Sequence, residues 1–328
     1  MKGCGILKID FRSVVPAGRL RPWIRVAPAT SILYGGARQF VTAAKVIDGR
    51  AAAARLRAKL AYRVETFLTR HGVTPALAII RAGTDPVAAI HARSVISACA
   101  AAGIESVSVE FAADTDTSSL VEVLERFNAD PAVHGILVQR PLPRNMDTRR
   151  IFAGISVAKD VDGSHFYEMQ GMFAGDTAFP PCAPSGVLKL LESEGVPIEG
   201  EHVVIVGAGN IVGQPLASML LQRGATVSIC HANTRDLTQY TIIADILIVA
   251  AGRPRLIVPS MVRTGAVVVD VGINRLPDGT LTGDVEFEGV SAKAARITPV
   301  PGGVGPMAVT MLLENTVVAA ERATIPLG

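Results

Sequence analysis

Cysteine, aromatic residues and long hydrophobic runs are all scarce in this sequence of 328 residues. The four cysteines are Cys4, Cys99, Cys182 and Cys230. They lie far apart and form no CxxC or His/Cys cluster, so they suggest neither a disulfide framework nor a metal site, and we expect a reducing, cytoplasmic location. The most apolar stretch, 242–252, is too short to span a bilayer and contains Asp245, so we expect no membrane partner.

An excess of one charge is also lacking, because 32 basic residues face 29 acidic ones and give a formal net charge of +3. This balance and the absence of a basic run with interleaved aromatics argue against a nucleic-acid partner. The exception is the first forty residues, where seven Lys and Arg face Asp10 alone. We expect residues 1–43 to form an extension without stable structure, arising from an upstream start codon or, as a weaker alternative, serving as a transit segment.

From Ala44 onward, segments with helical periodicity alternate with short apolar strands. Leu56, Leu60 and Val64 predict a helix that ends at Gly72. Further helices are predicted at 88–103 and around 117–127, and strands at 76–80, 106–111 and 135–139. Strands separated by helices in this way indicate an α/β fold with a parallel, doubly wound sheet.

A second α/β series begins at 202–215, where a buried strand meets a glycine-rich turn and a helix, and continues with strands at 226–230, 246–252 and 266–272. Gly207, Gly209 and Gly213 form GxGxxxG, one residue longer than the common fingerprint. Such glycines let the backbone approach a pyrophosphate, which the N–H groups and dipole of the following helix stabilise. We therefore predict a Rossmann-type dinucleotide site, with a tight packing turn as the alternative.

The choice of dinucleotide depends on the segment after the next strand. Residues 228–236 contain no acid before Asp236, although a carboxylate there is typical of NAD binding. The absence favours NADP. NAD remains the alternative, because no Arg is unambiguously placed for a 2′-phosphate.

Several segments are too unusual to be generic. They are "HGILVQRPLP" (134–143), "KDVDG" (159–163), "PPCAPSG" (180–186), "TPVPGGVGPMAVTMLLENT" (298–316), "GAGNIVGQP" and "VVDVGINR". From about Ala44 to about Ala320, the chain resembles the bifunctional methylenetetrahydrofolate dehydrogenase/methenyltetrahydrofolate cyclohydrolase family. The resemblance implies two α/β domains around a cleft, a folate substrate, one-carbon chemistry and a homodimer. By it, residues 44–160 with a returning helix 303–328 bind folate, and 161–302 form the NAD(P)-binding Rossmann domain.

The resemblance also assigns site residues. It places Gln139 near the reacting one-carbon unit, Asp162 against the pterin, and Pro301, Gly302 and Gly303 in a loop over the substrate. A carboxylate suits the pterin because it can accept hydrogen bonds from two adjacent N–H groups. The residues alone leave Asp162 equally readable as a turn-former beside Gly163. The cofactor contacts would be Gly207, Ala208, Gly209, Ile211, Val212, Gly213, Ala232 and Ile273.

The chain departs from the family on the helix predicted at 88–103. There the family carries Tyr-x-x-x-Lys, and this chain has His91 and Val95. Valine has no proton to transfer, so we predict oxidation of 5,10-methylenetetrahydrofolate with weak or lost cyclohydrolase activity. The alternatives are a fully bifunctional enzyme that uses His91 as a catalytic group, and a non-catalytic folate- or nucleotide-binding paralogue. Arg140 also interrupts the family's "VQLPLP".

Overall fold

The computed structural model describes residues 43–164 and 179–324, all within one compact unit. The extension predicted at 1–43 lies outside these residues apart from residue 43. In the described part of the chain, no helix is long and apolar enough to cross a membrane.

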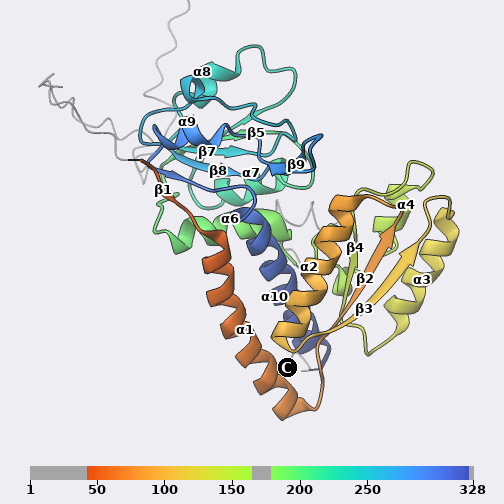
Figure 1. The fold of residues 1–328 in the computed structure, drawn as a ribbon. Helices are drawn as coiled ribbons and strands as arrows, with labels where there is room; N and C mark the ends of the chain where they lie inside the picture. The colour runs from red at the N-terminus through yellow and green to blue at the C-terminus, as the bar shows by residue number, and fades with distance from the viewer. Residues whose placement is uncertain (1–42, 165–178, 325–328) are drawn as a thin grey trace, which may run out of the picture. The chain divides into compact units, whose positions relative to one another are not determined.

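The first half is built on a three-stranded parallel sheet in the order β3-β2-β4. Its strands are β2 (Ala76–Ala82), β3 (Glu105–Phe111) and β4 (Gly135–Val138), which confirms the three predicted strands to within two residues. The helices α2 (Pro86–Ala102) and α3 (Thr117–Ala129) cover opposite faces of this sheet (Figure 1). Both faces of β2 and β4 are therefore buried, as in a doubly wound fold.

The second half contains a six-stranded parallel sheet in the order β1-β11-β8-β7-β5-β6. Its strands are β1 (Lys45–Val46), β5 (His202–Val206), β6 (Thr226–Cys230), β7 (Ile246–Val249), β8 (Val267–Asp270) and β11 (Arg296–Ile297). The predicted strands at 226–230, 246–252 and 266–272 are confirmed, the last two as shorter strands. Strand β1 was not predicted, because a two-residue strand shows no periodicity. It pairs in parallel with β11 at the edge of this sheet.

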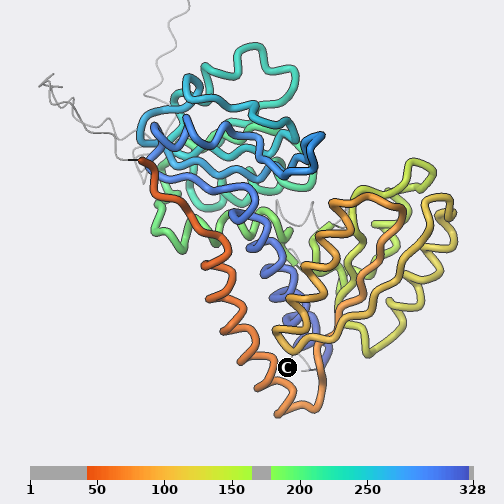
Figure 2. The backbone as a smooth tube through the Cα atoms, in the orientation of Figure 1, coloured from red at the N-terminus to blue at the C-terminus, as the bar shows by residue number. Residues whose placement is uncertain are grey.

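Three long helices pack against one another in the described chain. They are α1 (Gly49–His71), α6 (Cys182–Ser193) and α10 (Val304–Thr324). Figure 2 shows α1 and α10, which lie near opposite ends of the sequence, running side by side. Asp48 caps α1 by accepting a hydrogen bond from the Ala51 amide. The helix ends at Gly72, as predicted, and this glycine adopts the left-handed conformation.

The remaining elements are short and lie mostly on the connections. They are the helices α4 (Thr148–Ala153), α7 (Gly213–Leu221), α8 (Leu237–Thr241) and α9 (Phe287–Ser291), the 3₁₀ turns η2 (Val157–Lys159) and η3 (Pro259–Met261), and the antiparallel pair β9 (Asn274–Arg275) and β10 (Leu281–Thr282). Of these, α7 bears most directly on function, because it follows the glycine-rich turn after β5.

Candidate active site

His91 and Gln139 are brought into direct contact. His91 lies on α2, whose first turn is fixed by Pro86 and by the Asp85 carboxylate, which accepts from the Ala88 amide at 2.8 Å. Gln139 follows β4, and its side-chain Oε1 is 2.9 Å from His91 Nδ1. Because an amide oxygen only accepts, this contact makes Nδ1 the donor.

The amide nitrogen of Gln139 is unsatisfied. The residue is only 3% exposed, and no hydrogen-bond partner for its Nε2 exists among the described residues. A buried donor without a partner costs about 1–3 kcal/mol, so such groups are rare away from functional sites. A substrate oxygen or nitrogen that accepts from Nε2 would remove this cost.

Val95 lies one helical turn beyond His91 and is completely buried, at 0% exposure. It belongs to an apolar cluster with Leu60, Leu77 and Leu137. It therefore acts as a core residue, and it brings no charge, proton or hydrogen bond to the neighbouring His91–Gln139 pair.

Asp162 lies in a small cavity of about 50 Å³. The cavity is lined by Arg140, Asp162, Gly163, Ser164, Pro181, Cys182, Ala183, Asn210 and Ile211. The Ser164 hydroxyl donates to Asp162 Oδ2 at 2.6 Å. Burial, with a smaller contribution from Asp162, raises the pKa of the Cys182 thiol well above its usual value, so this cysteine is a neutral wall. The cavity joins the predicted pterin residue to the glycine-rich turn.

Two glycines of that turn are required by the fold, and a third is not. A Cβ on Gly207, whose φ is 119°, would lie 2.1 Å from the Ala250 carbonyl oxygen. One on Gly213 would lie 1.9 Å from the Gly207 carbonyl oxygen. Around Gly209, in contrast, a Cβ would meet no protein atom within 4 Å. The fold therefore leaves open space at the position where a ligand's phosphate would approach the backbone.

The start of α7 fits a dinucleotide pyrophosphate. Its N-cap residue, Val212, provides no side-chain cap. Gln214 donates its amide to the Gly209 carbonyl and Pro215 has no N–H, so among residues 213–215 the amide of Gly213 is left for an anion. Ala208, Ile211, Ala232 and Ile273 all follow the carboxyl ends of strands in the same sheet, where ligands of α/β folds bind. Ile211 is 48% exposed and Ile273 51% exposed, which is unusual for isoleucine and leaves both free to cover a bound ring.

The predicted substrate loop precedes α10. Its Val300–Pro301 peptide bond is cis, Pro301 is exposed, and Gly302 and Gly303 are buried. A Cβ on Gly49 would lie 1.8 Å from the Gly303 carbonyl oxygen, so the first residue of α1 fixes the position of this loop.

Two buried carboxylates that the sequence analysis did not single out shape the loops after β7 and β8. Asp270 accepts hydrogen bonds from the amides of Gly272, Asp284 and Val285. Asp284 accepts from the amides of Ala251, Gly252 and Arg253 and from Asn274 Nδ2. Burial raises the pKa of Asp270 to about 6, although its three amide donors act in the opposite direction. The available signal was an aspartate at the carboxyl end of a buried strand.

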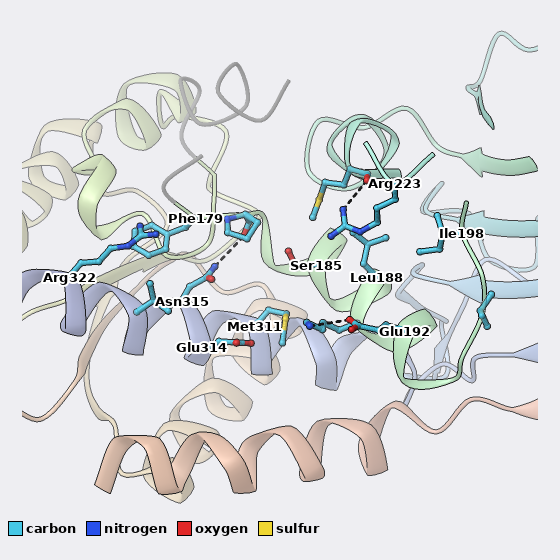
Figure 3. A pocket seen from close by; sticks show the side chains of 15 residues that line it. Phe179, Ser185, Leu188, Glu192, Ile198, Arg223, Met311, Glu314, Asn315 and Arg322 are labelled. Carbon is cyan, nitrogen blue, oxygen red and sulfur yellow. Dashed lines mark hydrogen bonds and ion pairs between the residues drawn. The ribbon is translucent and has the colours of Figure 1, made fainter. Parts of the chain in front are cut away.

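A cavity of about 570 Å³ lies elsewhere, between α6, α7 and α10 (Figure 3). It contains none of the predicted site residues. Three of its charged side chains have partners within the protein: Lys189 pairs with Glu192 at 3.0 Å, and Arg223 donates to the Met219 carbonyl. We therefore place the candidate active site at the smaller cavity, where the polar side chains converge.

Comparison with known families identifies both halves of the chain. The family model described as the catalytic domain of tetrahydrofolate dehydrogenase/cyclohydrolase matches residues 47–162. The model described as the NAD(P)-binding domain of the same family matches residues 181–324.

Individual relatives agree with these matches. The bifunctional protein FolD of Nitrosospira multiformis is 51% identical over 280 residues, which are 85% of this chain and 97% of that relative. The crystal structure of bifunctional FolD from Campylobacter jejuni has a TM-score of 0.82 at 45% identity, and the match covers 85% of this chain and 99% of that one. The Trypanosoma brucei enzyme, complexed with NADP and an inhibitor, has a TM-score of 0.83 at 36% identity, covering 86% and 98%.

Proposed function

Because this chain belongs to the tetrahydrofolate dehydrogenase/cyclohydrolase family, we propose that it oxidises 5,10-methylenetetrahydrofolate and that its cyclohydrolase activity is weak or lost. The chain is an enzyme of tetrahydrofolate one-carbon metabolism whose cofactor is NADP. One observation carries the finer proposal: residue 95 is a completely buried valine, one turn from His91.

The dehydrogenase reaction needs orientation above all. When bound, NADP accepts the hydride from the one-carbon bridge. The unpaired Nε2 of Gln139 supports a role in holding the substrate beside that bridge. Asp162 would accept from the pterin N–H groups, and the Pro301–Gly303 loop would cover the substrate. None of these roles requires a proton to be moved, so the loss of a lysine leaves them intact.

The cyclohydrolase reaction needs more, because water must attack the methenyl bridge and protons must be transferred as the ring opens. Removing the group that transfers them costs about 10²- to 10⁴-fold in rate. Val95 cannot supply that group, and Arg93, two residues earlier on α2, is exposed on another face of the helix. Hydrolysis is therefore expected to be slow.

One observation favours a bifunctional enzyme as the second candidate. The Nδ1 of His91 donates to Gln139, which leaves Nε2 as the ring nitrogen that would act as a general base. On this alternative, His91 takes over the proton transfer that the family assigns to lysine.

Two assays on one preparation test the proposal. The first follows formation of reduced nicotinamide from methylenetetrahydrofolate with NADP or NAD, and the second follows loss of methenyltetrahydrofolate absorbance above the buffer rate. We expect turnover in the first and close to the buffer rate in the second. Robust hydrolysis would contradict the loss of cyclohydrolase activity, and its disappearance in His91→Ala would support the second candidate. Ligand binding without any oxidation would indicate a non-catalytic paralogue.

The proposal extends to organisation. We propose that residues 44–160 with α10 bind folate and that 161–302 bind NADP, in a cytoplasmic homodimer. The packing of α10 against α1, α2 and β4 supports the first assignment, although α10 also packs extensively against α6 of the 161–302 segment. The buried free thiols of Cys99, Cys182 and Cys230 support a reducing location. A monomer in sedimentation equilibrium would contradict the dimer.

A further inference from the structure

Arg140 is a cation at the candidate site that the proposed reaction does not use. Its guanidinium carbon lies 3.9 Å from the centroid of the Phe152 ring, so the side chain is held by stacking. Among the described residues, none accepts a hydrogen bond from it and none forms an ion pair with it. An arginine has five N–H donors in a fixed planar arrangement. These donors therefore remain available to a ligand.

The position of Arg140 links the two halves of the site. It follows Gln139 directly at the end of β4, and it lines the same cavity as Asp162. The other side of that cavity is formed by Asn210 and Ile211, which belong to the glycine-rich turn before α7. Arg140 is the one lysine or arginine among the described residues that line this cavity, and the turn itself, 207–213, contains neither residue type.

The surroundings of Arg140 favour binding of an anion beside its guanidinium. Burial lowers its pKa, and the negative charges of Asp162 and Asp160 offset this effect only in part. The carboxylate of Asp162 accepts a hydrogen bond from Ser164 and forms no ion pair with Arg140. A pterin ring is uncharged and offers N–H donors at this end of the cavity, whereas a dinucleotide brings a pyrophosphate with two negative charges.

We propose that Arg140 is a cofactor-binding residue whose guanidinium donates hydrogen bonds to the pyrophosphate of NADP across the cavity. The inference rests on the proposal that the 207–213 turn holds that pyrophosphate. The planar guanidinium matches two phosphate oxygens at once, and partial burial strengthens the contact. Because Arg140 adjoins Gln139, it ties the cofactor to the strand end that carries the substrate-binding amide.

Binding of NADP without folate, measured by calorimetry, tests the inference. We expect Arg140→Leu to weaken NADP binding about tenfold or more and to reduce its dependence on salt. The NADP affinity of Arg140→Lys should lie between those of Arg140→Leu and the unmodified protein, because an ammonium keeps the charge and loses the bidentate geometry. The matched control is Arg144→Leu, four residues further on in the same connection and exposed, which should bind NADP as the unmodified protein does.

A second titration separates this inference from the function it rests on. Methylenetetrahydrofolate, titrated without cofactor, should bind Arg140→Leu and the unmodified protein equally. Weaker folate binding with unchanged NADP binding would overturn the inference and assign Arg140 to the substrate. Neither titration involves turnover. The absence of dehydrogenase activity would therefore refute the proposed function, and the two titrations would still show whether Arg140 binds NADP. Arg140→Lys, which retains the charge and stem, repeats the test if Arg140→Leu fails to fold.

Discussion

Replacing Gln139 with methionine is expected to stabilise the ligand-free protein while impairing its activity. The substitution keeps the length of the side chain and removes a buried donor with no partner, which relieves about 1–3 kcal/mol. It also removes the 2.9 Å contact with His91, worth about 0.5–1.5 kcal/mol. His91 is only half-buried, so water can replace the lost partner. The difference of the central values is a gain of about 1 kcal/mol in the free energy of unfolding.

The activity of Gln139→Met should change in the opposite direction. If Nε2 donates to the substrate, losing one neutral hydrogen bond of about 1.4 kcal/mol lowers kcat/KM for methylenetetrahydrofolate about tenfold. Urea denaturation of the ligand-free protein measures the first quantity, and initial rates of NADP reduction measure the second.

The matched control is Gln239→Met, which changes an exposed glutamine on α8 and should alter neither quantity. The reasoning would be refuted by a Gln139→Met protein that is destabilised by more than about 1 kcal/mol and keeps its full kcat/KM. That result would mean that Gln139 is a structural amide whose partner is a water molecule. A gain in stability together with a loss of activity is the mark of a residue kept for function.

Two further predictions concern the second half of the chain. Gly209→Ala should fold normally and weaken NADP binding about tenfold, because its Cβ occupies open space where the phosphate approaches. Gly213→Ala should instead lose about 3 kcal/mol of stability or fail to fold, because its Cβ clashes with Gly207. Equal NADP affinity of Gly209→Ala and the unmodified protein in calorimetry would contradict the expectation for Gly209. The second prediction concerns Asp270, whose pKa of about 6 in the folded protein lies above the unfolded value of about 3.9. Between these pH values the native state binds more protons than the unfolded state. The free energy of unfolding should therefore fall as pH rises from about 4 to 6. Urea denaturation at pH 5 and pH 7.5 should show a decrease of about 1.4 kcal/mol, and Asp270→Asn should lack it. Identical pH dependence in both proteins would rule this out.

Most of the fold could be predicted from local patterns. The strand at β2 and the glycine that ends α1 follow from apolar runs and from the left-handed conformation that glycine adopts easily. The pairing of β1 with β11 could not, because it joins two-residue strands separated by about 250 residues of sequence. Nothing in so short a segment encodes its partner, and the pairing depends on where the rest of the chain brings these ends.

The resemblance predicts individual site residues but not the contacts between them. The resemblance placed His91 and Gln139 near the reaction, and their hydrogen bond agrees with that placement. It gave no sign that the amide nitrogen of Gln139 is left unpaired, since satisfaction of a buried group depends on every neighbour. Arg140 was visible only as a departure from the family's pattern. Its stacking on Phe152 depends on a contact between the segment after β4 and α4 that no spacing in the sequence reveals.

The proposed replacement of a lysine by Val95 bears directly on the packing of α2. Val95 completes an apolar cluster with Leu60, Leu77 and Leu137, so restoring a charge at this position must disturb that cluster. Val95→Lys should therefore lose the valine's burial, about 1.5–3 kcal/mol, in addition to the cost of placing an ammonium there. The same burial would lower the pKa of the new lysine towards the range in which it can exchange protons at neutral pH.

We accordingly expect Val95→Lys to be less stable in urea and faster in hydrolysis of methenyltetrahydrofolate than the unmodified protein. Val95→Met, similar in length and uncharged, should show no gain in hydrolysis. A folded Val95→Lys protein with no increase in hydrolysis would show that the valine is not what limits this reaction. In that case the site around Gln139 would lack more than one group needed for hydrolysis, and His91→Tyr would be the next variant to combine with Val95→Lys.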